Sequence, residues 1–319
     1  MMLTIPEKYL KPLDYLFILR PTLFFPVWII TLAGYSTHFT SGETIIWWNT
    51  AINWRLFFNF CILTLVAGAT FIFNQLQDTE SDRDNRKLFL ISEEHIHPRT
   101  ARIIGITLAA IGLIVFLVQS FQLFIVLGLF ILVWGYLYNY PPFTWKDRAL
   151  PGIVANLLGG MLLFLIGWLM AGDFSVEVFL WMIPYTLAWG AVALLTTIPD
   201  QEGDAKHDKK TFAVKYGEKI TIWLATIWVF LAFVLGMIIN DPIITHPTLL
   251  ALPLFIITCF NLKKEWVLRT IRFPLLFIGL ILCVQFPYFF IAILINYYLA
   301  KIYYVNRFEL DYPTFKVEE

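Results

Sequence analysis

Charged residues are scarce in this chain, and so are cysteines. Only 14% of the 319 residues are Asp, Glu, Lys or Arg, and acidic and basic residues balance to a formal net charge of zero. This balance gives no electrostatic basis for binding nucleic acid, so we expect no nucleic-acid partner. The three cysteines, Cys61, Cys259 and Cys283, all lie in apolar runs, which argues against a disulfide framework and against a cysteine zinc site.

Apolar residues take the place of the missing charges. They make up 59% of the chain, aromatic residues alone make up 18%, and the mean hydropathy is +0.72. A soluble domain of this length has no means of burying so much apolar surface. The composition therefore predicts an all-α, multi-pass protein of the lipid bilayer.

The apolar runs predict about nine membrane-spanning helices. Most of them reach the roughly 20 residues that cross a bilayer. Pro287 is expected inside the last span, where neighbouring helices can satisfy the carbonyl group that its ring leaves free. The residues after this span, 301–319, mix aromatic and charged side chains and are expected to form an interfacial tail. The predicted spans are 16–38, 55–77, 101–118, 121–140, 150–171, 176–199, 218–239, 247–262 and 274–300.

Lysine and arginine are distributed unevenly between the two sides of these spans. If the N-terminus lies in the cytoplasm, all but four of the 23 basic residues fall on the cytoplasmic side. This bias follows the positive-inside rule and favours an odd number of spans in the cell (inner) membrane. The four cations assigned to the outer side are Arg55, Lys301, Arg307 and Lys316.

Two acidic clusters follow membrane-length apolar runs, and both fall on the cytoplasmic side. Asn74, Asp78 and Asp82 are spaced four residues apart, and so are Asp200 and Asp204. On a helix this spacing places the side chains on one face. Carboxylates are ligands that Mg²⁺ prefers, and the oxygens of a diphosphate complete its octahedron. Carboxylates at a bilayer boundary cost free energy and usually have a function. We therefore expect the four aspartates to bind Mg²⁺ and a diphosphate together.

Cations and polar groups near the clusters are candidates to hold the remaining phosphate charge. Tyr138 and Lys146 flank the Pro141-Pro142 pair, which ends a helix, so both can reach a phosphate. Asn74 has two interpretations. It could donate a hydrogen bond to the diphosphate or orient a metal ligand, or it could form a hydrogen bond to a neighbouring helix. The basic candidates are Arg83, Arg86, Lys87, Lys146, Lys206, Lys209 and Lys210.

Three motifs carry a resemblance to a known family. They read Asn74-x-x-x-Asp78-x-x-x-Asp82, Tyr138-x-x-Pro-Pro-x-x-x-Lys146 and Asp200-x-Glu-Gly-Asp204, and an Arg20-Pro21 pair precedes them. Together they resemble the UbiA superfamily of intramembrane prenyltransferases over about residues 15–300, closest to the homogentisate prenyltransferase, chlorophyll synthase and digeranylgeranylglyceryl phosphate synthase branches. Residues 88–94 depart from the Asp-Arg-Pro-Ile-Pro-Ser-Gly-like segment of many members.

The resemblance implies one transmembrane domain over residues 1–319, with its helices around a lipid-accessible central cavity. It implies Mg²⁺-dependent transfer of a prenyl chain from a prenyl diphosphate to a small aromatic or polar acceptor, through an allylic carbocation. Asn74, Asp78, Asp82, Asp200 and Asp204 take the catalytic positions, and the four aspartates hold the metal. The residues expected at the diphosphate are Arg20, Arg83, Arg86, Tyr138, Lys146, Lys206 and Lys210.

Two other classes of membrane protein fit the sequence less well. A cation-coupled transporter could use the paired aspartates, but transport carboxylates usually lie near the bilayer midplane rather than at helix ends. A CDP-alcohol phosphotransferase would need an Asp-Gly-x-x-Ala-Arg arrangement, and the chain contains no Asp-Gly pair.

Overall fold

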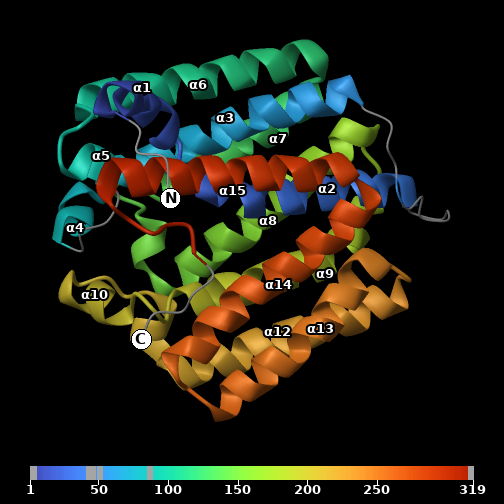
Figure 1. Ribbon diagram of the computed structural model, residues 1–319. Helices are drawn as coiled ribbons and strands as arrows, with labels where there is room; N and C mark the ends of the chain where they lie inside the picture. The colour runs from blue at the N-terminus through green and yellow to red at the C-terminus, as the bar shows by residue number, and fades with distance from the viewer. Residues whose placement is uncertain (1–5, 41–47, 49–52, 85–88, 315–319) are drawn as a thin grey trace.

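The computed structural model describes residues 6–40, 48, 53–84 and 89–314. Over these ranges the secondary structure is helical apart from one isolated bridge between Arg148 and Lys210, which confirms the all-α prediction (Figure 1). The helices are α1 (Glu7–Phe17), η1 (Pro21–Leu23), α2 (Phe24–Thr40), α3 (Trp54–Gln77), α4 (Thr79–Asp84), α5 (Phe89–Ser92), α6 (Pro98–Gln119), α7 (Phe121–Phe130), η2 (Ile131–Leu137), η3 (Trp145–Asp147), α8 (Ala149–Ala171), α9 (Val178–Thr196), α10 (Gln201–Lys206), α11 (Phe212–Tyr216), α12 (Glu218–Ile238), α13 (Pro242–Phe260), α14 (Lys264–Gln285) and α15 (Pro287–Phe308).

Within the described residues, eight helices are long and apolar enough to cross a membrane, and the bent pair of α1 with η1 and α2 makes a ninth. The predicted number of spans is thus confirmed. The segment Phe121–Leu137, formed by α7 and η2, is apolar but shorter. It corresponds to the predicted span 121–140.

The predicted span 274–300 is wrong, because it merges parts of two helices. The chain breaks at Phe286, which is extended at φ −123° and ψ 84°, and Pro287 begins α15. Proline has no N–H group to continue the hydrogen bonding of α14, whereas its fixed φ suits the first turn of a new helix. Pro274, expected at the start of a span, lies inside α14 instead.

The helix α15 returns the chain to the end of the bundle where α1 begins. Arg307, in the last turn of α15, bonds the carboxylate of Asp14 in α1 and lies 3.3 Å from His95 Nδ1. The prediction that Lys301 and Arg307 lie opposite the acidic clusters is therefore wrong. Residues 301–308 also belong to α15, so the tail begins at Glu309.

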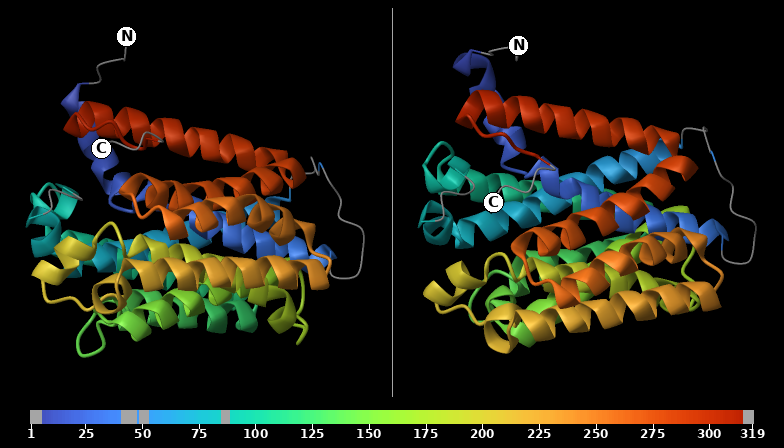
Figure 2. Two further views of the ribbon diagram at one scale, coloured as in Figure 1. Left: turned by 90° about the horizontal axis from the view of Figure 1, so that it is seen from below. Right: turned by 60° about the horizontal axis from the view of Figure 1, so that its bottom comes forward.

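The long helices pack side by side, with α3 and α6 toward one flank and α12 and α13 toward the other (Figures 1 and 2). The closest helix pair is α2 with α8. A Cβ atom on Gly34 would lie 2.0 Å from the carbonyl oxygen of Phe164, and one on Gly167 would lie 1.8 Å from that of Thr31. Only glycine allows these two backbones to touch, as small residues do between membrane helices.

The short helices α4, α5 and α10 gather at one end of the bundle, the end where α1 begins (Figure 1). Each follows or precedes a long helix at the point where its apolar stretch stops. This end therefore collects the polar loops that carry both acidic clusters.

Candidate active site

The first acidic cluster forms at the C-terminal end of α3. Asp78 is the residue that ends the helix, and its N–H still donates to the carbonyl oxygen of Asn74 at 3.1 Å. The Asn74 Nδ2 group donates to Asp78 Oδ2 and to Asn139 Oδ1, both at 3.0 Å. Asn139 is itself fixed, because its Nδ2 donates to the carbonyl oxygen of Trp134 at 2.7 Å. The end of η2 thus orients Asn74, and Asn74 orients Asp78.

Two lysines from distant loops bind Asp78. Lys146 Nζ lies 2.6 Å from Asp78 Oδ2, and Lys209 Nζ lies 3.3 Å from Asp78 Oδ1. Burial of the Asp78 carboxylate acts to raise its pKa, but the charges and hydrogen bonds of the two lysines outweigh burial and hold the pKa below its usual range. Asp78 is therefore ionised and compensated at neutral pH.

The second acidic cluster reaches the same place through a contact between loops. The helix α9 ends at Thr196. After Pro199, Asp200 is the N-cap residue of α10. Further on, the Lys210 N–H donates to the Asp147 carbonyl oxygen at 2.8 Å and joins this loop to η3. The contact places the neighbouring Lys209 side chain among the carboxylates of the two loops.

Lys209 is the residue at which the two clusters meet. Its charge interacts with Asp78, Asp147 and Asp204, and these carboxylates raise its pKa although burial acts to lower it. The pKa of Asp204 is raised by burial, against opposing effects of Thr211 and Lys209. The pKa of Asp147 is likewise raised by burial. Two helix ends that are far apart in sequence therefore converge on one charged centre.

Asp82 lies one turn beyond Asp78, with its N–H donating to the Asp78 carbonyl oxygen at 2.7 Å. Burial and the nearby Asp78 charge raise the pKa of Asp82 to about 6, against the opposing charges of Arg20, Lys146 and Lys209. Because burial is the main cause, the raised pKa marks a carboxyl group that is costly to ionise where it lies. A cation bound between Asp78 and Asp82 would favour the ionised form.

The other predicted residues lie at different distances from this centre. Tyr138 lies close enough to Asp78, Asp147 and Asp204 to feel their charges, and burial is the main cause that raises its pKa to about 12. Asp200, Lys206 and Lys210 are exposed at the surface of the second loop. Arg83 donates from Nε to the carbonyl oxygen of Ser92 at 2.9 Å and so ties α4 to α5. Arg86 lies outside the described residues.

The sequence analysis did not identify Asn139 and Asp147 as residues of the centre. It named Lys209 among the basic candidates but not among the residues expected at the diphosphate. Asn139 and Asp147 belong to no acidic motif with helical spacing, so nothing in the sequence marked them. Asp147 Oδ1 is buried and, among the described residues, accepts no hydrogen bond, although Lys209 Nζ lies 3.8 Å away. Lys209 was one of three neighbouring lysines, and only the backbone contact at Lys210 decides which of them points at Asp78.

The donor set fits Mg²⁺ when a substrate supplies part of the coordination shell. Within the described residues, no group of three or more Asp, Glu, His or Cys side chains is arranged to enclose a metal by itself. Each cluster instead offers a pair of carboxylates. Mg²⁺ is commonly held by one or two carboxylates and by the phosphate oxygens of a substrate. Asp78 with Asp82, and Asp200 with Asp204, suit that division.

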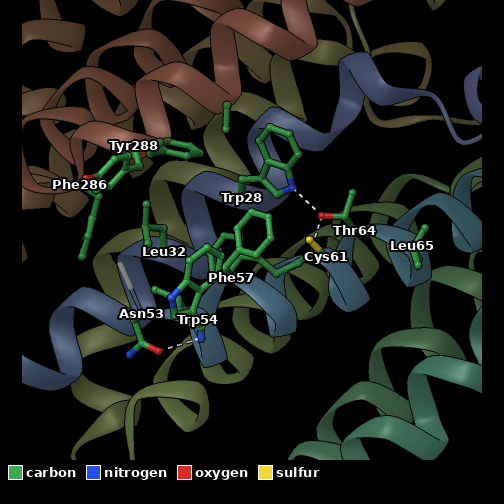
Figure 3. A pocket seen from close by; sticks show the side chains of 14 residues that line it. Trp28, Leu32, Asn53, Trp54, Phe57, Cys61, Thr64, Leu65, Phe286 and Tyr288 are labelled. Atoms are coloured by element: carbon green, nitrogen blue, oxygen red, sulfur yellow. Dashed lines mark hydrogen bonds between the residues drawn. The ribbon is translucent and has the colours of Figure 1, made fainter. Parts of the chain in front are cut away.

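A cavity of about 630 Å³ lies away from the charged centre, between α2, α3 and the corner that joins α14 to α15 (Figure 3). Its lining is almost entirely apolar, and at Trp28 the indole N–H donates to Thr64 Oγ1 at 2.8 Å. Thr64 precedes Asp78 by some four helical turns, or about 20 Å along α3. Trp54 and Phe57, which border the cavity, are exposed.

A family model places this geometry in a known group of proteins. The model of the UbiA prenyltransferase family matches residues 27–281, from the first turn of α2 to near the end of α14. The helix α15 lies beyond the last matched residue.

Three curated proteins are similar to the chain over about half of its length. The chain is 29% identical to 2-acyl-4-prenylphloroglucinol 6-prenyltransferase of Humulus lupulus, over 47% of this chain and 39% of that protein. It is 29% identical to the probable homogentisate phytyltransferase 2 of Oryza sativa, over 55% and 49%. It is also 29% identical to digeranylgeranylglyceryl phosphate synthase of Methanospirillum hungatei, over 54% and 61%. The chain thus spans about 40% to 60% of the length of these relatives.

The fold is similar to solved structures of the same family. A UbiA homologue from Archaeoglobus fulgidus, solved bound to GPP and Mg²⁺, superposes with a TM-score of 0.64 at 19% identity, covering 88% of this chain and 99% of that one. This likeness concerns the arrangement of the helices. The matched family model, the membrane-length helices and the shared architecture lead to one conclusion: the chain is an integral membrane protein that belongs to the UbiA prenyltransferase family.

Proposed function

We propose that this protein is a Mg²⁺-dependent prenyltransferase, which moves a prenyl chain from a prenyl diphosphate to a small aromatic or polar acceptor. The observation that carries the proposal is the meeting of the two acidic clusters at Lys209, whose Nζ lies 3.3 Å from Asp78 although the two residues are 131 positions apart. Carboxylates from two helix ends and buried lysines at one centre suit a diphosphate with its metal ions.

Some residues of the centre would bind the metal, and others would bind the phosphate groups. Asp78, Asp82, Asp200 and Asp204 would hold Mg²⁺, which supplies positive charge to the phosphate oxygens when it is bound. Asn74 keeps Asp78 oriented through its 3.0 Å hydrogen bond. A UbiA homologue from Archaeoglobus fulgidus was solved with GPP and Mg²⁺ and also with DMAPP and Mg²⁺, which supports this assignment.

The lysines would stabilise the leaving group. The bond between C1 of the prenyl chain and the diphosphate oxygen breaks, and the diphosphate leaves with the electron pair. Lys146, Lys209 and Arg20 provide fixed positive charge where negative charge develops, which is the most effective form of electrostatic catalysis. The allylic cation then forms a bond with a nucleophilic atom of the acceptor, which loses a proton.

The acceptor is proposed by class. The names of two relatives indicate aromatic acceptors, a phloroglucinol and homogentisate, and the third names a glyceryl phosphate. An electron-rich aromatic ring or a hydroxyl group can each capture an allylic cation, so the shared chemistry is a small nucleophile delivered to the polar end of the bundle. The positive-inside distribution supports a cytoplasmic location of this end.

The proposal is tested with purified protein, one radiolabelled prenyl diphosphate and a panel of aromatic and glyceryl phosphate acceptors. The expected result is a labelled prenylated product with at least one acceptor, and its loss when Asp78 is replaced by Ala. Product formation by the Asp78→Ala and Asp204→Ala variants at the level of the unaltered protein would refute the assigned site.

A further inference from the structure

Arg20 has an unusual backbone conformation. It adopts φ 56° and ψ 61°, in the left-handed region, and joins α1 to η1 at the 40° bend between the first helices. A residue with a side chain is unfavourable in this conformation, and such residues persist only where the surrounding structure holds them. The Arg20 charge acts on Asp82 on one side and on Tyr304 of α15 on the other. Arg20 was expected from the sequence to bind the diphosphate. The same residue is thus the one with the unfavourable backbone conformation.

Three side chains hold the backbone around Arg20. From α3, Gln75 Nε2 donates to the buried carbonyl oxygen of Ile18 at 2.8 Å. From α15, Asn296 Nδ2 donates to the carbonyl oxygen of Pro21 at 2.9 Å. From the segment after α15, the Tyr312 hydroxyl donates to Thr22 Oγ1 at 3.2 Å. Two of the three supports therefore come from the C-terminal part of the chain.

The helix α15 is anchored to the same segment by further contacts. The Tyr303 ring stacks on Phe17 with ring centroids 3.6 Å apart, and its hydroxyl donates to Asp14 at 2.6 Å. Arg307 pairs with Asp14 at 3.1 Å. Figure 2 shows α1 crossing the C-terminal end of α15. Of the eight long helices in the described residues, α15 is the least buried, so most of its remaining surface faces lipid.

We infer that α15 and the segment after it position Arg20 for the diphosphate, and that Asn296 is a positioning residue for the reaction. This inference rests on the proposed function. Asn296 reaches no reacting group, and it acts through Pro21, the residue that follows Arg20. Without its hydrogen bond the left-handed turn loses a support and the guanidinium moves away from Asp82. The helix that lies beyond the matched family region thereby contributes to the site.

The experiment is a double-mutant cycle with Asn296→Leu, Arg20→Ala and the double variant, measured as kcat and KM for the prenyl diphosphate with Mg²⁺ at saturation. Asn296→Leu is expected to lower kcat/KM about tenfold, because small displacements of a positioned group are costly in catalysis. In the Arg20→Ala background the same change is expected to have no further effect. Asn306→Leu is the matched control, because Asn306 lies on the same helix and its Nδ2 donates to the carbonyl oxygen of Ile302 within α15, at 2.8 Å.

A second variant distinguishes loss of positioning from a folding defect in Asn296→Leu. Tyr312→Phe removes only the hydroxyl that reaches Thr22, and we expect a loss of about threefold that also disappears in the Arg20→Ala background. Effects of Asn296→Leu and Arg20→Ala that multiply would overturn the inference, as would full activity of Arg20→Ala. Either result leaves the proposed function standing, since that depends on the loss of activity in Asp78→Ala.

Discussion

Lys209 lies with its Nζ 3.3 Å from Asp78 Oδ1, while Lys210 beside it uses its backbone N–H to hold Asp147 and leaves its side chain exposed. The ion pair with Asp78 makes Lys209 part of the charged centre. The backbone hydrogen bond of Lys210 fixes the position of the loop, in which Lys206 and Lys210 are exposed to solvent. This difference separates three residues that a sequence motif treats alike.

The lysines should therefore differ in activity assays. Lys209→Ala is expected to lower kcat/KM by at least about a hundredfold, because a positioned charge near the leaving group is lost. Lys206→Ala and Lys210→Ala are expected to stay within about threefold of the unaltered protein, because exposed charges interact weakly. Steady-state kinetics with a labelled prenyl diphosphate provide the measurement. Similar losses in all three variants would contradict the geometry.

Asp78 and Asp204 should be indispensable. Replacing either with Ala removes a carboxylate from one of the two clusters, and we expect turnover to fall below about a thousandth of the original, as for other losses of metal-binding groups. Asp173→Ala, at the opposite end of the bundle, serves as the control and should retain activity. Size-exclusion profiles in detergent would establish that the inactive variants remain folded.

Metal removal should show that Mg²⁺ and diphosphate bind together. EDTA is expected to stop turnover and added Mg²⁺ to restore it. Because the described carboxylates form pairs rather than a closed group of three, calorimetry should detect only weak Mg²⁺ binding until a diphosphate is present. Tight Mg²⁺ binding without diphosphate, or activity that survives EDTA, would argue against the shared coordination.

Asp241 gives a prediction about stability. Burial raises its pKa from 3.8 to about 6, although Tyr185 and the Ile243 N–H donate to it. An acid that binds its proton more tightly in the folded state stabilises the fold at low pH and loses this contribution as the pH rises from 3.8 through 6. The shift corresponds to about 3 kcal/mol.

The comparison of the unaltered protein with Asp241→Asn isolates this contribution, because the amide does not titrate. Thermal unfolding in detergent at pH 4 and at pH 7 should show the unaltered protein losing about 3 kcal/mol relative to the variant. Parallel pH dependence in the two proteins would mean that the Asp241 carboxyl is not shifted.

The return of α15 predicts that Glu309 and the cluster-side loops face the same compartment. Single cysteines at Glu309 and Arg99, in a background without the native cysteines, should react with a membrane-impermeant maleimide from one side of sealed vesicles. A cysteine at Asp173 should react only from the other side. Labelling of Glu309 and Asp173 from the same side would contradict the return of α15 to the end that carries the acidic clusters.

The hydropathy of the chain was enough to predict an all-helical membrane protein, because continuous apolar runs of membrane length suit helices, which make all their backbone hydrogen bonds within one span. The boundary between α14 and α15 was harder. Proline occurs inside membrane helices and also begins them, so Pro287 alone did not indicate which of the two applied. The contact between Arg307 and Asp14, which fixes the direction of α15, joins residues 293 positions apart.

The four-residue spacing of the aspartates determined which carboxylates share a helix end, since that is a local property of helical geometry. Which lysine joins them, and that Asn139 and Asp147 belong with them, was decided only by the packing of loops against one another. A hydrogen bond such as that from Lys210 to Asp147 depends on where two helices end in space. No local pattern in the sequence encodes that position, because it results from the burial of all the long helices together.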